Sequence, residues 1–416
     1  MQTVQSTVRI KTPFVRWVQA AGLAIAAACI AGCGGGGGSS NNSGGTPVTP
    51  AGGNQVALSV NSGVANVVNI PTVSVTVCPP GSTSNCQTIN NIQVDTGSYG
   101  LRVVSSALTS SLSGALPVTT VSGSQIAECA QFAIGYTWGT VRTANVTIGS
   151  ETASSIPVQI IGDLASSTVP ASGCAIGPAQ NTAQALGANG ILGIGVAPYD
   201  CGTTCATSAN SSIYYSCPSG TNCRQTTLPV TQQVANPVQN FPVDNNGVVL
   251  QMPSISSTGA SSASGTLTFG IGTQANNTLT ASQTFTTNSA GNMVSSTFNG
   301  STVTAFLDSG SNAYFLSDQT LTLCTNSNYS GFYCPSSPTS RTATLVGVNG
   351  AVGTVTMNVT SAATLFGNTS NYAFNDLAAA GSLGQLDLGL PFFYGRTIFF
   401  GMDRRATGGA APYVAF

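Results

Sequence analysis

Two segments of the sequence resemble each other, and each carries an aspartate in the same setting. Residues 92–103 read IQVDTGSYGLRV, and residues 305–316 read AFLDSGSNAYFL. In both, an apolar run delivers an aspartate, Asp95 or Asp308, into a hydroxyl–glycine–hydroxyl turn, and a second apolar run follows. One such turn is common, because Asp bonds its own backbone and Gly accepts positive φ. Two copies with matching flanks, in a chain with only nine aspartates, are hard to obtain from turn formation alone.

A pair of carboxyl groups can perform acid–base chemistry without other residues. Two carboxylates about 3 Å apart cannot both ionise cheaply, so the pair holds one proton over a broad acidic range. The ionised member can take a proton from a bound water while the protonated member polarises a carbonyl group. If Asp95 and Asp308 meet in space, we expect hydrolysis through an activated water with no covalent intermediate.

The composition excludes most other chemistries. The chain has no histidine, which removes Ser-His-Asp and Cys-His nucleophiles, His-ligated zinc and imidazole catalysis. Only 5% of the 416 residues are charged and the formal net charge is −1, whereas phosphate recognition needs clustered Lys and Arg. We therefore expect no nucleic-acid partner, no metal and no cofactor. With so few carboxylates, we also expect the stability to change little between neutral pH and about pH 4.

The two aspartates lie in a chain of short β-strands. Runs rich in Val, Ile, Thr and aromatic side chains, separated by Gly, Ser, Asn and Pro, occur at residues 73–77, 144–148, 267–269 and 355–359. Helix signals are scarce, and the best are at residues 231–236 and 376–380. We therefore predict an all-β protein. The chain after residue 33 is longer than the usual length of a single β domain, so we predict two lobes.

The paired motifs resemble those of the pepsin-like aspartic peptidases, in which each of two lobes contributes one Asp-(Thr/Ser)-Gly-(Thr/Ser) turn. Other elements occur in the order typical of that family. They are a flap and an alternating strand, a Gly-Ile-Leu-Gly element, a glycine-flanked strand and a closing segment, at residues 135–149, 190–195, 265–270 and 388–416. The resemblance covers most of the chain after about residue 56. With the leader described below, the whole chain resembles a branch of bacterial lipoproteins of unknown function.

The resemblance implies a fold and a division into lobes. The fold would be an all-β, bilobal, pepsin-like acid-protease fold, with two related β-barrel-like lobes and a cleft between them. Residues 56–245 would form the N-terminal lobe, with the first Asp motif, the flap and a disulfide-rich insertion. Residues 246–416 would form the C-terminal lobe with the second motif.

The resemblance also implies roles for single residues. Asp95 and Asp308 would be the catalytic pair. The hydroxyl residue after each aspartate would cross-brace the turns, the glycine would allow their tight geometry, and the last hydroxyl would bond the outer carboxylate oxygen; the matching residues are Thr96 and Ser309, Gly97 and Gly310, and Ser98 and Ser311. For the substrate flap we select Tyr136, with Trp138 sharing the role, while an ungapped comparison selects Phe132. The sequence departs from the family at Arg102 and at Asp387, which occupies a position that is normally apolar.

Residues 1–33 resemble a bacterial lipoprotein signal peptide. Basic residues precede an apolar stretch at residues 20–30, and the segment Ile-Ala-Gly-Cys ends it at Cys33. A plain secretory signal and a membrane span are the alternatives, and the apolar run is short for a span. Cleavage before Cys33 would free its thiol for acylation, and residues 34–55, rich in Gly, Ser and Asn, would form a flexible tether. We expect an exported protein anchored in a lipid bilayer. The resemblance to known lipoproteins implies the outer membrane rather than the inner one, because Gly34 rather than Asp follows the cysteine.

The cysteines after Cys33 form an even set of ten, as a disulfide framework in an oxidising compartment requires. We pair Cys78 with Cys86 and Cys324 with Cys334, because each pair closes a short isolated loop. By elimination, Cys129 then pairs with Cys174, and two bridges form among Cys201, Cys205, Cys217 and Cys223. A zinc site built from these last four cysteines is the alternative, and export favours the bridges.

Two functions remain open from the sequence. The first is a monomeric aspartic endopeptidase of the bacterial cell envelope that acts on peptides or unfolded proteins in the interlobe cleft. The second is a pepsin-like fold with weak or no catalysis that serves as a surface binding lipoprotein. A carboxylate-pair glycosidase is more distant, because neither glutamate lies in a suggestive setting. Carboxyls of Asp95 and Asp308 within hydrogen-bonding distance would favour the first function.

Overall fold

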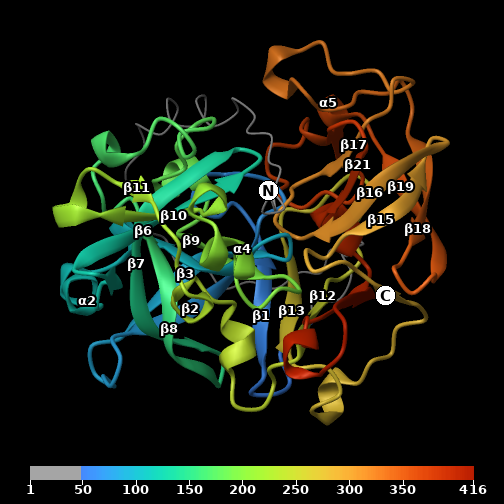
Figure 1. Cartoon of the computed structure of the whole chain (residues 1–416). Coiled ribbons are helices and arrows are strands. Elements are labelled where there is room, and N and C mark those ends of the chain that lie inside the picture. Colours follow the sequence, from blue (N-terminus) through green and yellow to red (C-terminus); the bar gives the residue numbers. More distant parts are fainter. Residues whose placement is uncertain (1–47) are drawn as a thin grey trace, which may run out of the picture.

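The computed structural model describes residues 48–416. The predicted signal peptide, the acylation site Cys33 and most of the predicted tether lie outside the described residues. The described chain is almost entirely β-structure, and its two halves form two lobes, coloured blue to green and orange to red in Figure 1. This is the all-β, two-lobed fold predicted from the sequence.

The strands are short and occur throughout the described chain, as expected where Val, Ile and Thr alternate with polar residues. The strands of the first half are β1 (Gln55–Val60), β2 (Pro71–Cys78), β3 (Gln87–Asp95), β4 (Tyr99–Val104), β5 (Thr120–Val121), β6 (Ser124–Phe132), β7 (Gly135–Ile148), β8 (Glu151–Ile161), β9 (Gly190–Ile194), β10 (Tyr214–Cys217) and β11 (Arg224–Gln225). The strands of the second half are β12 (Gly247–Gln251), β13 (Ala263–Phe269), β14 (Thr284–Thr286), β15 (Met293–Phe298), β16 (Ser301–Asp308), β17 (Tyr314–Leu316), β18 (Thr339–Val346), β19 (Val352–Val359), β20 (Ala378–Ala380), β21 (Gln385–Gly389), β22 (Thr397–Gly401) and β23 (Tyr413–Ala415).

The helices are short and lie in the connections. The α-helices are α2 (Ser110–Ala115), α3 (Ala183–Leu186), α4 (Thr203–Thr207) and α5 (Ala362–Leu365). The 3₁₀ turns are η1 (Ser105–Ala107), η2 (Ser166–Thr168), η3 (Ala209–Ser211), η4 (Pro218–Gly220), η5 (Val230–Gln232), η6 (Pro237–Asn240), η7 (Ala275–Asn277), η8 (Ser327–Tyr329), η9 (Leu390–Phe393) and η10 (Arg405–Thr407). Within residues 48–416, none of the helices has the length and apolar character needed to cross a membrane.

The strands form two sheets, and the larger one joins the lobes. Its order is β11-β10-β6-β7-β8-β4-β9-β3-β2-β1-β13-β12-β22-β23-β14, with β5 beside β6. The junction is the antiparallel pairing of β1 with β13, which runs from Gln55 opposite Thr268 to Val60 opposite Ala263 and lies at the centre of Figure 1. The smaller sheet, with the order β19-β18-β15-β16-β21-β17-β20, belongs to the second lobe.

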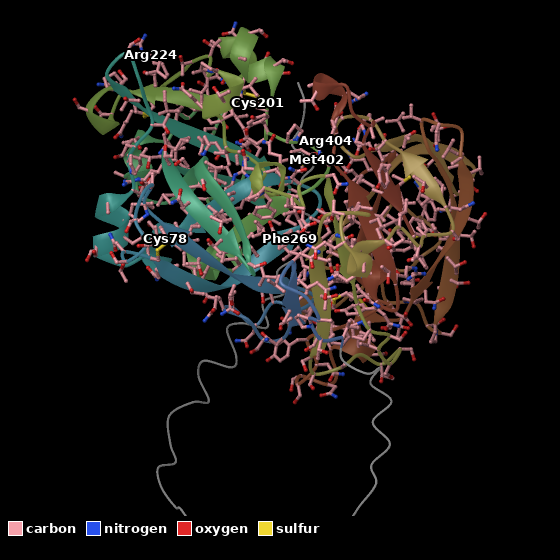
Figure 2. The ribbon with its side chains drawn as sticks, turned by 90° about the horizontal axis from the view of Figure 1, so that it is seen from below. Cys78, Cys201, Arg224, Phe269, Met402 and Arg404 are labelled. Carbon is pink, nitrogen blue, oxygen red and sulfur yellow. A yellow bond between two sulfur atoms is a disulfide. The ribbon has the colours of Figure 1, made fainter. Side chains whose placement is uncertain are left out.

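One apolar cluster continues from the first lobe into the second. It contains Leu58 of β1 together with Leu267 and Phe269 of β13, and all three side chains are fully buried. The rings of Phe269 and Phe241 meet edge to face, with their centroids 5.0 Å apart. Figure 2 shows Phe269 near the junction of the two lobes. Because both lobes bury side chains in the same cluster, their relative position is fixed by packing as well as by strand pairing.

Five disulfides join the ten cysteines that follow Cys33, and Cys78 and Cys201 can be located in Figure 2. The bridges are Cys78–Cys86, Cys129–Cys174, Cys201–Cys205, Cys217–Cys223 and Cys324–Cys334. The four cysteines of the zinc alternative are therefore used in two local bridges. In the part of the chain that the structure describes, no group of three or more His, Cys, Asp or Glu side chains is placed to hold a metal ion.

Two local expectations differ from the structure. The predicted tether reaches residue 55, but Asn54 is buried and its Nδ2 donates to the carbonyl of Phe269 at 2.9 Å. The ordered lobe begins before Val56 because β13 supplies partners that a Gly-rich sequence does not reveal. The helix signal at residues 376–380 is replaced by strand β20, which pairs in parallel with β17. Tertiary pairing overrides the helix preference of its three alanines there.

Candidate active site

Each aspartate ends a strand, and the two strands have equivalent neighbours. Asp95 ends β3, which lies parallel to β9 with Asp95 opposite Gly193. Asp308 ends β16, which lies parallel to β21 with Asp308 opposite Gly389. The crossing strands β9 and β21 then pair antiparallel with the strand that follows each turn, β4 and β17. The same three-stranded unit therefore occurs once in each lobe and carries one carboxyl each time.

The glycines opposite the aspartates are steric requirements of this unit. A Cβ atom at Gly193 would lie 2.5 Å from the backbone nitrogen of Tyr99, and one at Gly389 would lie 2.1 Å from the carbonyl oxygen of Ala313. Real Cβ atoms do not approach backbone so closely. Only glycine lets the crossing strand pass directly behind the turn.

Within each turn the aspartate accepts two hydrogen bonds. In both, Oδ1 accepts from the glycine amide two residues later, at 2.9 Å for Asp95 and 2.8 Å for Asp308. Oδ2 accepts from the hydroxyl three residues later, which is Ser98 at 2.6 Å and Ser311 at 2.9 Å. Hydrogen bonds that donate to a carboxylate favour its ionised form and fix its orientation.

Four hydrogen bonds brace the two turns against each other across the lobe junction. The Oγ1 atom of Thr96 donates to the carbonyl of Leu307 at 3.1 Å and accepts from the amide of Ser309 at 2.9 Å. Reciprocally, the Oγ atom of Ser309 donates to the carbonyl of Val94 at 2.9 Å and accepts from the amide of Thr96 at 3.1 Å. The two hydroxyls that were expected to cross-brace the turns therefore make this contact in the structure.

The two carboxyl groups meet. Both Asp95 and Asp308 are fully buried, and a Cβ added at Gly97 would lie 2.6 Å from the carboxyl carbon of Asp308. Burial, the charges of Asp95 and Asp387, and a hydrogen bond with Asp95 raise the pKa of Asp308 well above its usual value. The arrangement is that of a carboxyl pair which retains a proton where an isolated aspartate would have lost it.

Two residues that brace the site were not among the sequence candidates. The Nε2 atom of Gln93, two residues before Asp95, donates to the carbonyl of Gly310 at 2.9 Å in the other lobe. The Nδ2 atom of Asn69 donates to the carbonyl of Asn312 at 2.9 Å. A polar side chain on an apolar strand was an available signal for Gln93, whereas Asn69 is distant in sequence and offers none.

The flap candidates Tyr136 and Trp138 have buried side chains. Both belong to an apolar cluster with Cys129, Cys174 and Tyr215. The ring of Trp138 meets that of Tyr215 edge to face at 5.3 Å. Residues 136 and 138 share one face of β7. Cys174 and Tyr215, from later in the chain, pack against that face.

The alternative flap residue, Phe132, packs against the three-stranded unit that carries Asp95. It packs with Val104 of β4 and Ile191 of β9, and its ring lies 5.9 Å from the guanidinium carbon of Arg102. The choice among Tyr136, Trp138 and Phe132 for the flap position stays a prediction.

Over residues 50–416, the chain matches the family described as Protein of unknown function (DUF3443). The chain belongs to the DUF3443 family. Among solved structures it is similar to the aspartic proteinase from Irpex lacteus, with 16% identity, a TM-score of 0.46, and coverage of 87% of this chain and 96% of that chain. None of the curated proteins matches it.

Arg102 of this DUF3443 protein lies in a buried charged cluster. Its Nη2 atom donates to the carboxylates of Glu128 and, at 3.0 Å, Asp200. The hydroxyl of Tyr214 donates to the other Asp200 oxygen at 2.6 Å. One guanidinium faces two carboxyls, and burial together with the charge of Glu128 raises the pKa of Asp200 well above its usual value. Arg102 therefore ties β4, β6 and the loop of Asp200 together.

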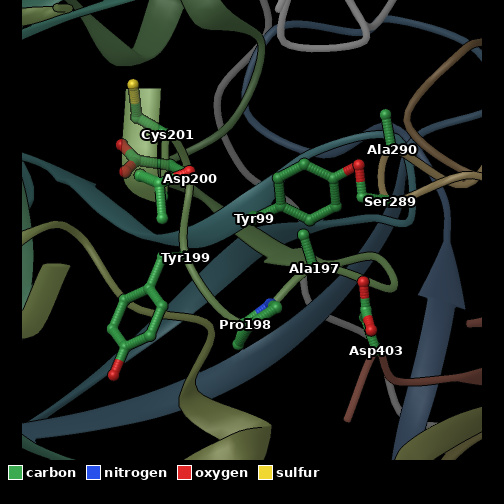
Figure 3. A pocket seen from close by; sticks show the side chains of 11 residues that line it. Tyr99, Ala197, Pro198, Tyr199, Asp200, Cys201, Ser289, Ala290 and Asp403 are labelled. Carbon is green, nitrogen blue, oxygen red and sulfur yellow. The ribbon is translucent and has the colours of Figure 1, made fainter. Parts of the chain in front are cut away.

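A pocket of about 190 Å³ lies beside the first aspartate turn of the DUF3443 chain (Figure 3). Its walls are Tyr99, the loop of residues 197–203, and Ser289, Ala290 and Asp403 from the second lobe. Burial and then the charges of Asp95 and Asp308 raise the pKa of the Tyr99 hydroxyl, so Tyr99 lies within electrostatic reach of the pair as well as lining the pocket. Neither aspartate of the pair is among the lining residues.

Proposed function

We propose that this protein is an aspartic endopeptidase that hydrolyses peptide bonds with a water activated between Asp95 and Asp308. The observation that carries the proposal is the reciprocal bracing of two like turns, which holds two buried carboxyls against each other. The raised pKa of Asp308 supports a pair that carries one proton at mildly acidic pH. The resemblance of the two motifs to those of pepsin-like peptidases supports the same reaction type.

In the proposed reaction, one carboxyl acts as a base and the other as an acid. The ionised carboxylate takes a proton from the water, and the protonated one donates a hydrogen bond to the substrate carbonyl. The water oxygen adds to the carbonyl carbon and gives a tetrahedral intermediate. As the C–N bond breaks, a carboxyl proton passes to the leaving amine and the pair returns to its singly protonated state.

The turns supply what this chemistry requires of the protein. The hydroxyls of Ser98 and Ser311 donate to the outer carboxyl oxygens and orient each group. The Thr96–Ser309 brace keeps the carboxyls from separating when charge develops between them. Fixed donors of this kind do not need to reorganise during the reaction, which lowers its barrier.

We also propose where the protein acts. The sequence of residues 1–55 supports export to the cell envelope and attachment to a lipid bilayer through acylated Cys33, with the outer membrane favoured. Within this proposal the substrate is a peptide or an unfolded protein, and the working unit is a monomer because one chain supplies both aspartates of the pair.

The complete burial of both carboxyls favours a second candidate, a surface binding lipoprotein. Catalysis requires water and a substrate to reach the pair, yet neither carboxyl is exposed and neither lines the adjacent pocket. A protein that binds a peptide or glycan at its surface has no such requirement. The two candidates differ in whether peptide bonds are cleaved.

The test is cleavage of an unfolded protein by the purified full chain between about pH 3 and pH 7, with and without a pepstatin-type transition-state mimic. Replacing Asp95 or Asp308 by Asn removes one member of the pair, so we expect cleavage to fall about a hundredfold or more. The matched control is Asp376→Asn, which changes a buried aspartate in the lobe of Asp308 that contacts Thr360 rather than the pair.

Cleavage by the wild type and by Asp376→Asn, with loss in both pair variants, supports the endopeptidase. If the intact protein cleaves nothing across this range, the endopeptidase proposal is wrong. Retained binding of peptide in that case supports the second candidate.

A further inference from the structure

A third carboxyl group is connected to the pair through a single hydroxyl. Asp387 lies on β21, the strand that crosses behind the second aspartate turn. The Oγ atom of Ser311 is 2.6 Å from Oδ2 of Asp387 and 2.9 Å from Oδ2 of Asp308. The hydroxyl of Ser311 therefore lies between the two carboxyls.

This geometry constrains the number of protons. A serine hydroxyl carries one hydrogen, so Ser311 can donate to only one of the two carboxyls. The other contact then needs a hydrogen from the carboxyl itself. The contact between the carboxyls of Asp95 and Asp308 needs a second carboxyl hydrogen. If all three contacts are hydrogen bonds, the three carboxyls together hold two protons and one negative charge.

The surroundings of Asp387 favour its protonated form. Its side chain is 2% exposed, and its Oδ1 atom has no hydrogen-bond partner. The neighbouring strands place Phe306 and Phe315 beside it. No ion pair within residues 48–416 includes Asp387 or Asp308. Burial, and then the charge of Asp95, raise the pKa of Asp387 well above its usual value, although the hydrogen bond from Ser311 lowers it.

We propose that Asp387 is a positioning residue that acts through Ser311 to keep the Asp95–Asp308 pair singly protonated up to a higher pH than the pair alone would allow. While Asp387 is neutral it donates to Ser311, and Ser311 donates to Asp308. If the pair loses its proton to solvent, the hydroxyl proton of Ser311 passes to Asp308 and the proton of Asp387 passes to Ser311. Asp387 is then the carboxylate, and its charge opposes a second loss from the pair.

The effect has a direction that can be measured, and its kinetic form rests on the proposed endopeptidase activity. Asp387→Asn and Asp387→Leu should each move the alkaline limb of the kcat/KM profile to lower pH by about one unit. The acidic limb should not move, because Asp387 is neutral there. Ser311→Ala should give the same alkaline shift, and Asp387→Asn should add nothing to it.

A merely structural role predicts a different result. Loss of packing at Asp387 would lower kcat/KM by the same factor at every pH and leave both limbs in place, and that outcome overturns the proposal. Asp376→Asn is the matched control and should leave the profile unchanged. Asp387→Leu and Asp387→Asn alter packing and polarity differently, so a shift shared by both does not arise from misfolding of either one.

A second measurement does not depend on activity. Because a native Asp387 holds a proton that the unfolded chain releases above about pH 4, the free energy of unfolding of the wild type should decrease with rising pH more steeply than that of Asp387→Asn. The slopes should differ by up to one proton. If the wild type cleaves nothing, the endopeptidase proposal fails, and this slope alone decides whether the third carboxyl is protonated. Equal slopes overturn the inference.

Discussion

The side chain of Thr96 serves two backbone groups of the opposite lobe, and both are buried. Its hydroxyl accepts from the amide of Ser309 and donates to the carbonyl of Leu307. A buried backbone group without a partner costs about 1–3 kcal/mol. The hydroxyl at this position therefore contributes to the stability of the whole protein as well as to the alignment of the carboxyls.

This gives a prediction for the brace. Thr96→Val keeps the shape of the side chain but removes both hydrogen bonds, so it should lower the free energy of unfolding by about 2–4 kcal/mol. Urea denaturation measures this, with an unchanged m-value showing that the native fold is retained. Thr96→Ser keeps the hydroxyl and should recover most of the loss. A Val variant as stable as the wild type would show that the brace is energetically unimportant.

At the residue scale, the sequence identified the groups that repeat and missed those that do not. Asp95, Asp308 and the hydroxyls beside them could be predicted because the same pattern occurs twice. Gln93 and Asn69 brace the same turns, but each occurs once, and their partners are known only when the lobes are in place. Asp387 could be recognised as unusual from the sequence, whereas its contact with the pair depends on the register of β21 against β16.

At the scale of elements, the strands were predictable from alternation, and their pairing was not. The three-stranded unit formed by β3, β9 and β4 is repeated by β16, β21 and β17. The sequence shows the turn of each unit clearly, but the crossing strand lies about 80 to 100 residues further along the chain. The face that each strand buries depends on distant partners, and the packing of Tyr136 and Trp138 against Cys174 and Tyr215 is an example that the local sequence does not show.

The crossing strands provide an element-scale prediction. Gly193→Ala and Gly389→Ala place a methyl group 2.5 Å and 2.1 Å from backbone atoms, so each should lower the free energy of unfolding by about 1–3 kcal/mol or more. Gly114→Ala in α2 is the matched control, because its Cβ would meet nothing within 4 Å and alanine favours helix. Chemical denaturation of the three variants measures the difference. Equal stabilities would mean that the crossing strands can move away from the turns.

At the scale of the whole molecule, the buried carboxyls determine how stability depends on pH. Burial raises the pKa values of Asp308, Asp387 and Asp200 well above their usual range. A carboxyl with a raised native pKa contributes stability that is fully present below its unfolded pKa and is lost as the pH rises through its native pKa. These three groups therefore make the fold more stable as the pH falls from neutral toward about pH 4.

Two other carboxyls act in the opposite direction at lower pH. Burial alone would raise the pKa of Asp318, but hydrogen bonds from Thr320 and Arg341 lower it to about 2. A hydrogen bond from Arg405 likewise lowers the pKa of Asp403. Their contribution is present above the unfolded pKa and is lost on further acidification. We expect the melting temperature to be highest near about pH 4 and to fall on both sides. Thermal unfolding followed by circular dichroism from pH 2 to pH 8 measures it.

Composition alone predicts a nearly constant stability between about pH 4 and neutral pH, whereas the buried carboxyls predict a decrease as the pH rises. The chain does contain few carboxylates, but Asp308, Asp387 and Asp200 are each buried near another carboxyl, and this raises their pKa values. A melting temperature that rises steadily from pH 4 to pH 8 would contradict the sign derived from these groups.

The pairing of β1 with β13 also has a mechanical consequence. If the chain is held at its N-terminal side, tension meets the hydrogen bond from the amide of Val48 to Ser264 of β13 and then the ladder between β1 and β13. That ladder spans both lobes, so a pull loads them together instead of drawing one away from the other. Strands β3 and β16 do not pair with β1. A pull therefore reaches the two aspartate turns only through other strands, with β2 between β1 and β3.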